Sequence, residues 1–122
     1  MSYNVSMWKT KLIGNLRIPV AALYEGGEDW QPNREEMEGG KTRFDWDGDA
    51  NYVIGRVEEG WLIVEGLCFR GVCSGSVLRD VIEPALKQST GGVVASRVWE
   101  GGDLIDLLIV CDGNLHTEAI EL

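Results

Sequence analysis

The sequence predicts one α+β domain that consists mainly of an antiparallel sheet with a single principal helix. Runs rich in Val, Ile, Leu and Trp have the length of strands and are separated by glycine-containing turns. One later segment instead shows the helical spacing of apolar residues. Because this helix interrupts a series of strands rather than alternating with them, α+β is favoured over α/β. A length of 122 residues fits one domain that spans 1–122.

The expected sheet has five to seven strands, bounded by glycines that mostly follow an acidic residue. Glycine adopts the positive φ that tight hairpin turns require. Segment 16–24 could form either an edge strand or a short helix, because Pro19 fits both structures. The other strand candidates are 3–12, 42–46, 52–57, 61–69, 93–99, 104–111 and 115–122.

The principal helix is predicted at about 76–88, directly before the last three strands. Pro84 should kink this helix or separate its last turn, because proline lacks the backbone N–H that a helix interior uses. The apolar residues at helical spacing are Val77, Leu78, Val81, Ile82, Ala85 and Leu86.

The acidic character of the chain restricts its partners. Eleven Lys and Arg face twenty Asp and Glu, which gives a formal charge of −9. Such a surface disfavours nucleic acids and anionic membranes but can attract cations or a basic protein. Segment 25–41 alone holds six acidic residues and two Gly-Gly pairs, and we expect it to be a long acidic loop, either functional or disordered.

We expect the protein to be cytoplasmic. The N-terminal residues lack the basic and apolar regions of a signal peptide, and the apolar run 104–111 contains Asp106 and is too short to cross a bilayer. Three cysteines, an odd number, argue against a secreted disulfide framework.

The last three strands allow a prediction of register. A turn at Gly101-Gly102 sets Arg97 opposite Asp106, and a turn at Gly113-Asn114 sets Cys111 opposite His116. The face predicted as the core carries Val94, Val98, Ile105, Leu107, Ile109, Cys111, Ile120 and Leu122. The other face carries Val93, Ala95, Arg97, Trp99, Leu104, Asp106, Leu108, Val110 and Ala119.

This second face is too apolar to meet water, so it should be covered by other parts of the chain, by a ligand or by a second subunit. We therefore expect a homo-oligomer, most simply a dimer, with Trp99, Leu104 or Leu108 near the centre of the interface. The candidates for a ligand pocket on the same face are Trp99, Arg97, Asp106, Leu104 and Leu108.

The cysteines and the single histidine are weaker candidates for a metal-binding or catalytic site. Cys68 and Cys73, like Cys111 and His116, are separated by four residues, which is longer than the spacing of a zinc knuckle. Cys73 precedes the helix, where a thiol can become nucleophilic, and His116 is its one candidate base. Packed cysteine is the preferred interpretation. No metal and no cofactor are expected.

Three classes of function stay open. The favoured one is a non-catalytic module that binds a small apolar or cationic ligand, or a protein partner. The alternative is an acidic inhibitor or immunity-type adaptor of a basic protein. A small enzyme that uses Cys73 and His116, or Asp106 and Arg97, is the least favoured, because the sequence contains no phosphate-binding loop, nucleophile elbow or paired-histidine motif.

Overall fold

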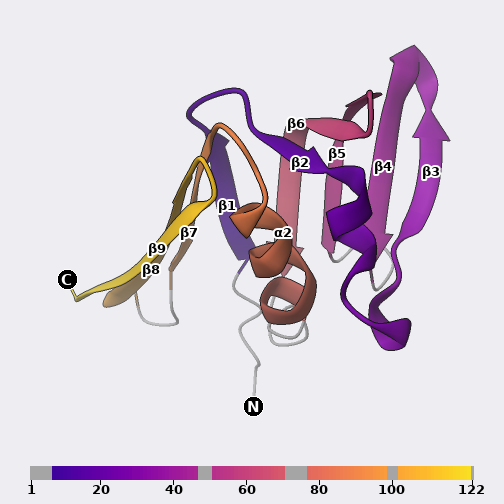
Figure 1. The fold of residues 1–122 in the computed structure, drawn as a ribbon. Coiled ribbons are helices and arrows are strands. Elements are labelled where there is room, and N and C mark those ends of the chain that lie inside the picture. The colour runs from indigo at the N-terminus through magenta and orange to yellow at the C-terminus, as the bar shows by residue number, and fades with distance from the viewer. Residues whose placement is uncertain (1–6, 47–50, 71–76, 99–101, 122) are drawn as a thin grey trace.

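The computed structural model describes residues 7–46, 51–70, 77–98 and 102–121. They form a sheet-rich α+β fold in which the paired strands are antiparallel (Figure 1). The described residues contain more strands than the five to seven expected. The strands are β1 (Met7–Leu12), β2 (Arg17–Pro19), β3 (Asn33–Met37), β4 (Lys41–Trp46), β5 (Asn51–Glu58), β6 (Trp61–Arg70), β7 (Gly92–Val98), β8 (Leu104–Cys111) and β9 (Asn114–Glu121).

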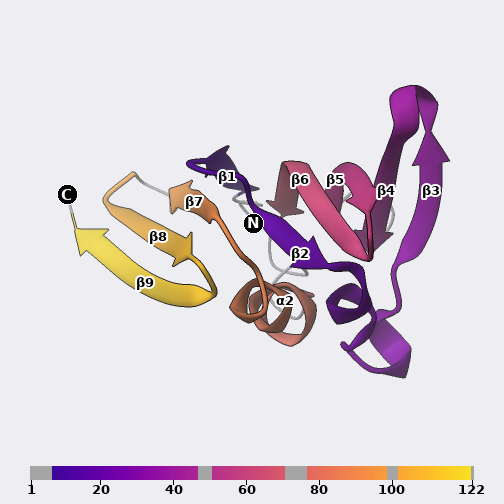
Figure 2. The same cartoon turned by 45° about the horizontal axis from the view of Figure 1, so that its top comes forward.

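The strands follow the order β3-β4-β5-β6-β1-β7-β8-β9, and β2 also pairs with β6. Among the described residues, β6 and β1 pair at two positions, Met7 with Arg70 and Trp8 with Phe69. Beyond this point β1 continues along β7 while β2 occupies the remaining edge of β6. Figure 2 shows the resulting arc of strands, with the helix on its concave side.

Two strands lie where the sequence left the structure open or predicted a loop. Residues Arg17–Pro19 form β2, and the 3₁₀-helix η1 (Val20–Tyr24) follows at once, so segment 16–24 contains both alternatives. The acidic segment 25–41 is not one long loop. It holds the short 3₁₀-helices η2 (Glu28–Trp30) and η3 (Glu38–Gly40) and, between them, β3, which pairs with β4 at the edge of the sheet.

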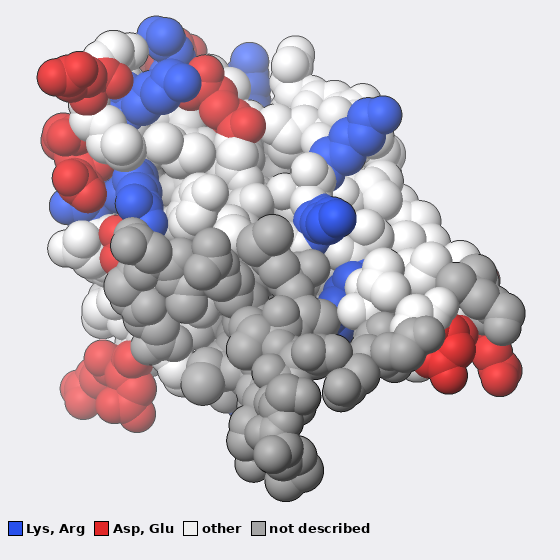
Figure 3. Space-filling model, turned by 180° about the vertical axis from the view of Figure 1, so that it is seen from behind, with Lys and Arg blue, Asp and Glu red and all other residues white. Residues whose placement is uncertain are grey.

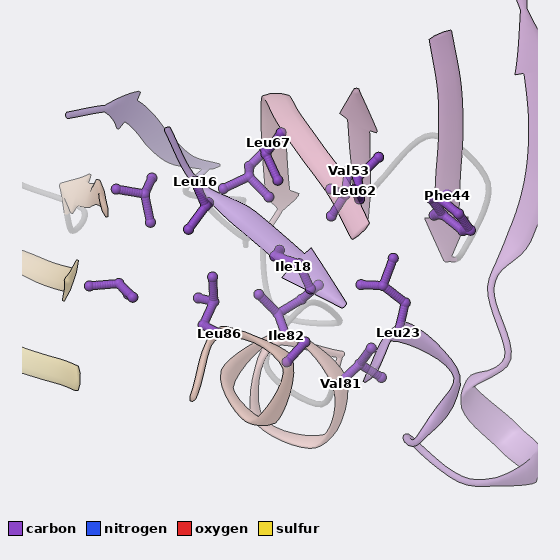
Figure 4. Close-up of a cluster of buried hydrophobic side chains, with 14 of the residues drawn as sticks. Leu16, Ile18, Leu23, Phe44, Val53, Leu62, Leu67, Val81, Ile82 and Leu86 are labelled. Atoms are coloured by element: carbon purple, nitrogen blue, oxygen red, sulfur yellow. The ribbon is translucent and has the colours of Figure 1, made fainter. Parts of the chain in front are cut away.

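The helix covers the concave face and completes the core. Its described part runs from Val77 through the π-helical η4 (Leu78–Ile82) to α2 (Glu83–Lys87), so it ends one residue before the predicted limit of 88, and residue 76 lies outside the described residues. The winding changes next to Pro84, which needs no N–H near the start of α2. Figure 4 shows side chains from the helix and from β2, β4, β5 and β6 meeting in one cluster. Of the six predicted helical positions, Val77, Val81, Ile82, Ala85 and Leu86 are buried there, and the side chain of Leu78 lies outside the described part of the structure.

The register of the C-terminal strands is confirmed at the first turn and wrong at the second. Arg97 lies opposite Asp106 and Val98 opposite Ile105, as predicted. At the second turn Cys111 pairs with Asn114 rather than with His116. The turn is therefore Asp112-Gly113, whose φ angles of 47° and 80° are those a two-residue hairpin turn needs.

The assignment of the core face is also wrong. Val93, Ala95, Leu108 and Val110 are at most 1% exposed and belong to the main core, because the helix packs on their face. Val98, placed in the core by the sequence, is 52% exposed. We call the helix-covered side of β1, β7, β8 and β9 the inner face and the opposite side the outer face. Leu108 is accordingly excluded from the centre of any subunit interface.

Candidate binding cleft

A row of cross-strand neighbours on the inner face forms the floor of the candidate site. Lys9 pairs with Ser96 in β1 and β7, which places Trp8 beside Arg97 one position further along. Arg97 pairs with Asp106 in β8, and Asp106 pairs with Ala119 in β9. Strand alternation sends all four side chains to the same face. Trp8, Arg97, Asp106 and Ala119 therefore form one row across four strands.

Arg97 makes two contacts within this row. Its Nη2 donates a hydrogen bond to Asp106 Oδ2 at 2.8 Å. Its guanidinium carbon lies 4.7 Å from the centre of the Trp8 ring, within the range of a cation–π contact. The side chains of Arg97 and Asp106 keep 20% and 22% of their surface exposed. The pair is thus fixed in place and still reaches the surface of the molecule.

This row is covered only in part, because Trp8 is buried whereas the side chains of Arg97 and Asp106 stay partly exposed. The backbone of Gly113 closely approaches that of Lys87, so the C-terminal end of α2 covers the turn between β8 and β9. Toward the other end of these strands a cleft of about 380 Å³ opens, with Glu83 from the start of α2 among its lining residues. The described residues of the lining are Trp8, Glu83, Arg97, Asp106, Leu107, Leu108, Thr117, Glu118 and Ala119.

The lining combines an apolar floor with an acidic rim. Trp8 and Leu108 are buried and present the apolar surface. Arg97 compensates the charge of Asp106, whereas Glu83 makes no ion pair with any residue in the described ranges. Because side chains alternate between the two faces of a strand, those of Leu107 and Glu118 point to the outer face. These two residues therefore border the cleft through their backbone atoms. The net charge of the lining is negative.

Three of the five pocket residues predicted from the sequence line the cleft: Arg97, Asp106 and Leu108. Leu104 is half-buried and does not line it, and Trp99 lies outside the described residues. Sequence reasoning missed Trp8, Glu83, Leu107, Thr117 and Glu118, and it placed Ala119 on the correct face without naming it for the pocket. Strand alternation in 3–12 fixes the faces of its residues, but no local pattern indicates that this strand lies beside β7, far away along the chain.

The thiol and imidazole candidates are dispersed. Cys68 is buried, whereas Cys111 and His116 are exposed and none of the three lines the cleft. His116 Nε2 lies 3.6 Å from Glu118 Oε2 on β9. Cys73 lies outside the described residues. In the parts of the chain that the structure describes, no group of three or more His, Cys, Asp and Glu side chains could hold a metal ion.

Comparison with known proteins supplies no relative. No protein-family model, curated protein or solved structure matches this chain. A search of the described helices finds none with the length and apolar character needed to cross a bilayer.

Proposed function

We propose that this protein is a non-catalytic binding module whose cleft takes a small organic cation with an apolar body. The observation that carries the proposal is the placement of Glu83 at the rim of a cleft whose floor is Trp8 and Leu108. A volume of about 380 Å³ lies within the usual range of small-molecule sites.

The charges of the lining support a cationic ligand over an anionic one. Among the described residues of the lining Arg97 is the single basic one, and it is already engaged by Asp106 and by the Trp8 ring. An anion would have to compete with Asp106 for the guanidinium group and would lie close to Glu83. A cation gains the attraction of the Glu83 carboxylate and contact with apolar surface, and aromatic or apolar walls with a few polar groups are typical of such sites.

The lining also favours binding over catalysis. Of the lining residues that the structure describes, Thr117 carries the one side-chain hydroxyl, and none is a cysteine or a histidine. A nucleophile needs an adjacent base within hydrogen-bond reach, and the lining offers Thr117 none beyond carboxylates. Asp106, the carboxylate beside it in the floor, is held in the ion pair with Arg97.

The acidic adaptor of a basic protein is the second candidate, and strand β3 is the observation that favours it. This edge strand is exposed along its whole length and carries Glu35 and Glu36. However, the Glu36 carboxylate already accepts 2.7 Å hydrogen bonds from the Thr42 hydroxyl and from Arg34 Nε, which lower its pKa. Since Glu36 is engaged within the chain, the cleft remains the better supported site.

Thermal unfolding in the presence of small organic cations tests the proposal. The panel comprises alkylammonium, benzyltrimethylammonium and guanidinium chlorides, with sodium benzoate and sodium chloride as charge and salt controls. A ligand that binds the folded state at about 100 times its Kd stabilises it by about 2.7 kcal/mol, so at least one cation should raise the Tm saturably by several degrees. Benzoate should not.

Two variants give this test its specificity. Glu83→Gln should weaken the binding of the active cation about tenfold, which corresponds to about 1.4 kcal/mol. Glu35→Gln, a matched change on the exposed strand β3, should leave the binding unchanged. The proposal is contradicted if no cation of the panel gives a saturable shift, or if the two variants weaken binding equally.

A further inference from the structure

The outer face of the C-terminal strands is apolar and uncovered by any other element among the described residues. Val98 and Ile120 are 52% and 38% exposed, and the apolar residues of β8 on this face are partly exposed as well. In Figure 3, which views the molecule from behind, the side of the C-terminal strands is mostly uncharged with scattered Lys and Arg, while acidic groups lie toward the margins. This distribution is unexpected for a chain with a net charge of −9.

The residues of this face lie in rows that the strand register defines. One row runs Lys9, Ser96, Leu107 and Glu118 across β1, β7, β8 and β9. The next runs Lys11, Val94, Ile109 and His116. A third contains Val98, Ile105 and Ile120. Exposed lysines thus lie on β1, apolar residues on β7 and β8, and Glu118 on β9.

We propose that the outer face binds a second copy of this chain. A two-fold axis parallel to the strands, between β7 and β8, places β1 of each copy opposite β9 of the other and β7 opposite β8. Since such an axis leaves the position along the strands unchanged, Lys9 faces Glu118 of the second copy. The same axis sets Val98 against Ile105 and Val94 against Ile109.

The charges distinguish this arrangement from the other face-to-face dimer. An axis perpendicular to the strands would place β1 opposite β1 and bring the lysines of the two copies together. The parallel axis instead forms two Lys9–Glu118 pairs at the flanks of an apolar centre, and packed sheets retain such an alignment to within about 30°. This is the self-complementary surface that a two-fold interface requires.

The dimer should be weak. Four strands spaced about 4.8 Å apart, with about six residues each, give a footprint of roughly 400 Å² per copy. The two copies together then cover about 800 Å², which is below the roughly 1,200 Å² of stable interfaces and in the range of weak, transient ones, so we expect a Kd in the micromolar range. The cleft lies on the opposite face, so self-association and ligand binding can be tested independently.

Analytical ultracentrifugation from about 1 to 300 µM, a range that brackets weak association, tests the proposal. The wild-type chain should shift from 13.5 kDa toward twice that mass as its concentration rises. Val98→Asp should raise the Kd more than tenfold, because the charge would lie against Ile105 of the second copy. The unfolding midpoint of this variant, measured at low concentration, should match the wild type, because Val98 is exposed in the single chain.

Exchanging the charges of Lys9 and Glu118 is the decisive part of the experiment. Lys9→Glu and Glu118→Lys should each raise the Kd about tenfold, because each creates two like-charge contacts per dimer. The double variant should restore the wild-type Kd to within about threefold. Glu35→Lys, on β3, is the control and should have no effect. A mass of 13.5 kDa at all concentrations, a dimer that survives Val98→Asp, or a double variant that is not restored would each overturn the proposal.

Discussion

Arg97 connects three strands through its side chain. It stacks on Trp8 of β1, bonds to Asp106 of β8 and itself belongs to β7. The sequence predicted its pairing with Asp106, because the Gly101-Gly102 turn fixes the register. Trp8 could not be assigned as its second partner, because the β1–β7 pairing joins distant parts of the chain.

Removing either member of this pair should destabilise the protein. Arg97→Met and Asp106→Asn should each lower the free energy of unfolding by about 1–3 kcal/mol, since each leaves a partly buried charge without its main partner. The double variant should lose less than the sum, with a coupling of about 1 kcal/mol. Urea unfolding of the four proteins measures this coupling. If the losses of the two single variants added up to that of the double variant, the Arg97–Asp106 hydrogen bond would contribute nothing to stability.

Gly91 is a second residue whose identity the structure explains. Its φ is 83°, and a Cβ built on it would lie 2.0 Å from the carbonyl oxygen of Asn15. Its N–H also donates to Asp112 Oδ1 at 2.9 Å, and its carbonyl accepts the Asp112 N–H at 2.8 Å. Gly91 therefore holds the segment before β7 against both the β1–β2 connection and the β8–β9 turn.

Comparison with Gly60 separates backbone strain from steric exclusion. Gly60 has a φ of 82° but open space where a Cβ would be. Gly60→Ala should therefore cost about 1–2 kcal/mol, the penalty of the left-handed conformation alone. Gly91→Ala should cost at least about 2 kcal/mol more, because the Asn15 backbone must also move. Equal losses in chemical denaturation would contradict the close approach at Gly91.

At the scale of elements, the helix was the most predictable part of the fold. Its apolar spacing indicated the buried face correctly, and the described side chains at those positions are buried. Strand β3 was missed because its five residues, Asn33–Met37, are all exposed and carry no apolar alternation. A strand formed at a solvated edge leaves little signal in the hydrophobic pattern.

The second hairpin shows how close the sequence came to the correct register. Asp-Gly is a favoured pair for a two-residue turn, and Asp112-Gly113 adopts it with both φ angles positive. Placing the turn at Gly113-Asn114 shifts the register by two residues, which keeps each side chain on its face but misaligns its partners. Cys111 and His116, set side by side by the sequence, are separated for this reason.

At the scale of the whole molecule, both the proposed binding cleft and the proposed dimer depend on which side of β7 and β8 the helix covers. Both sides of β7 and β8 carry large apolar residues, so periodicity alone could not tell which side the helix covers. The structure assigns the helix to the side of Leu108. The cleft is then the uncovered remainder of the inner face, and the outer face is left for a second copy.

Chemical denaturation of Leu108→Ala and Val98→Ala tests which face of β7 and β8 is buried. The measurements belong at about 1 µM, below the expected Kd of the dimer, so that each variant reports on the single chain. Leu108 is 1% exposed and Val98 is 52% exposed. Leu108→Ala should lower the free energy of unfolding by about 2–5 kcal/mol, and Val98→Ala should change it by less than about 0.5 kcal/mol. The reverse order would place the core on the Val98 face and remove the basis for both the cleft and the dimer.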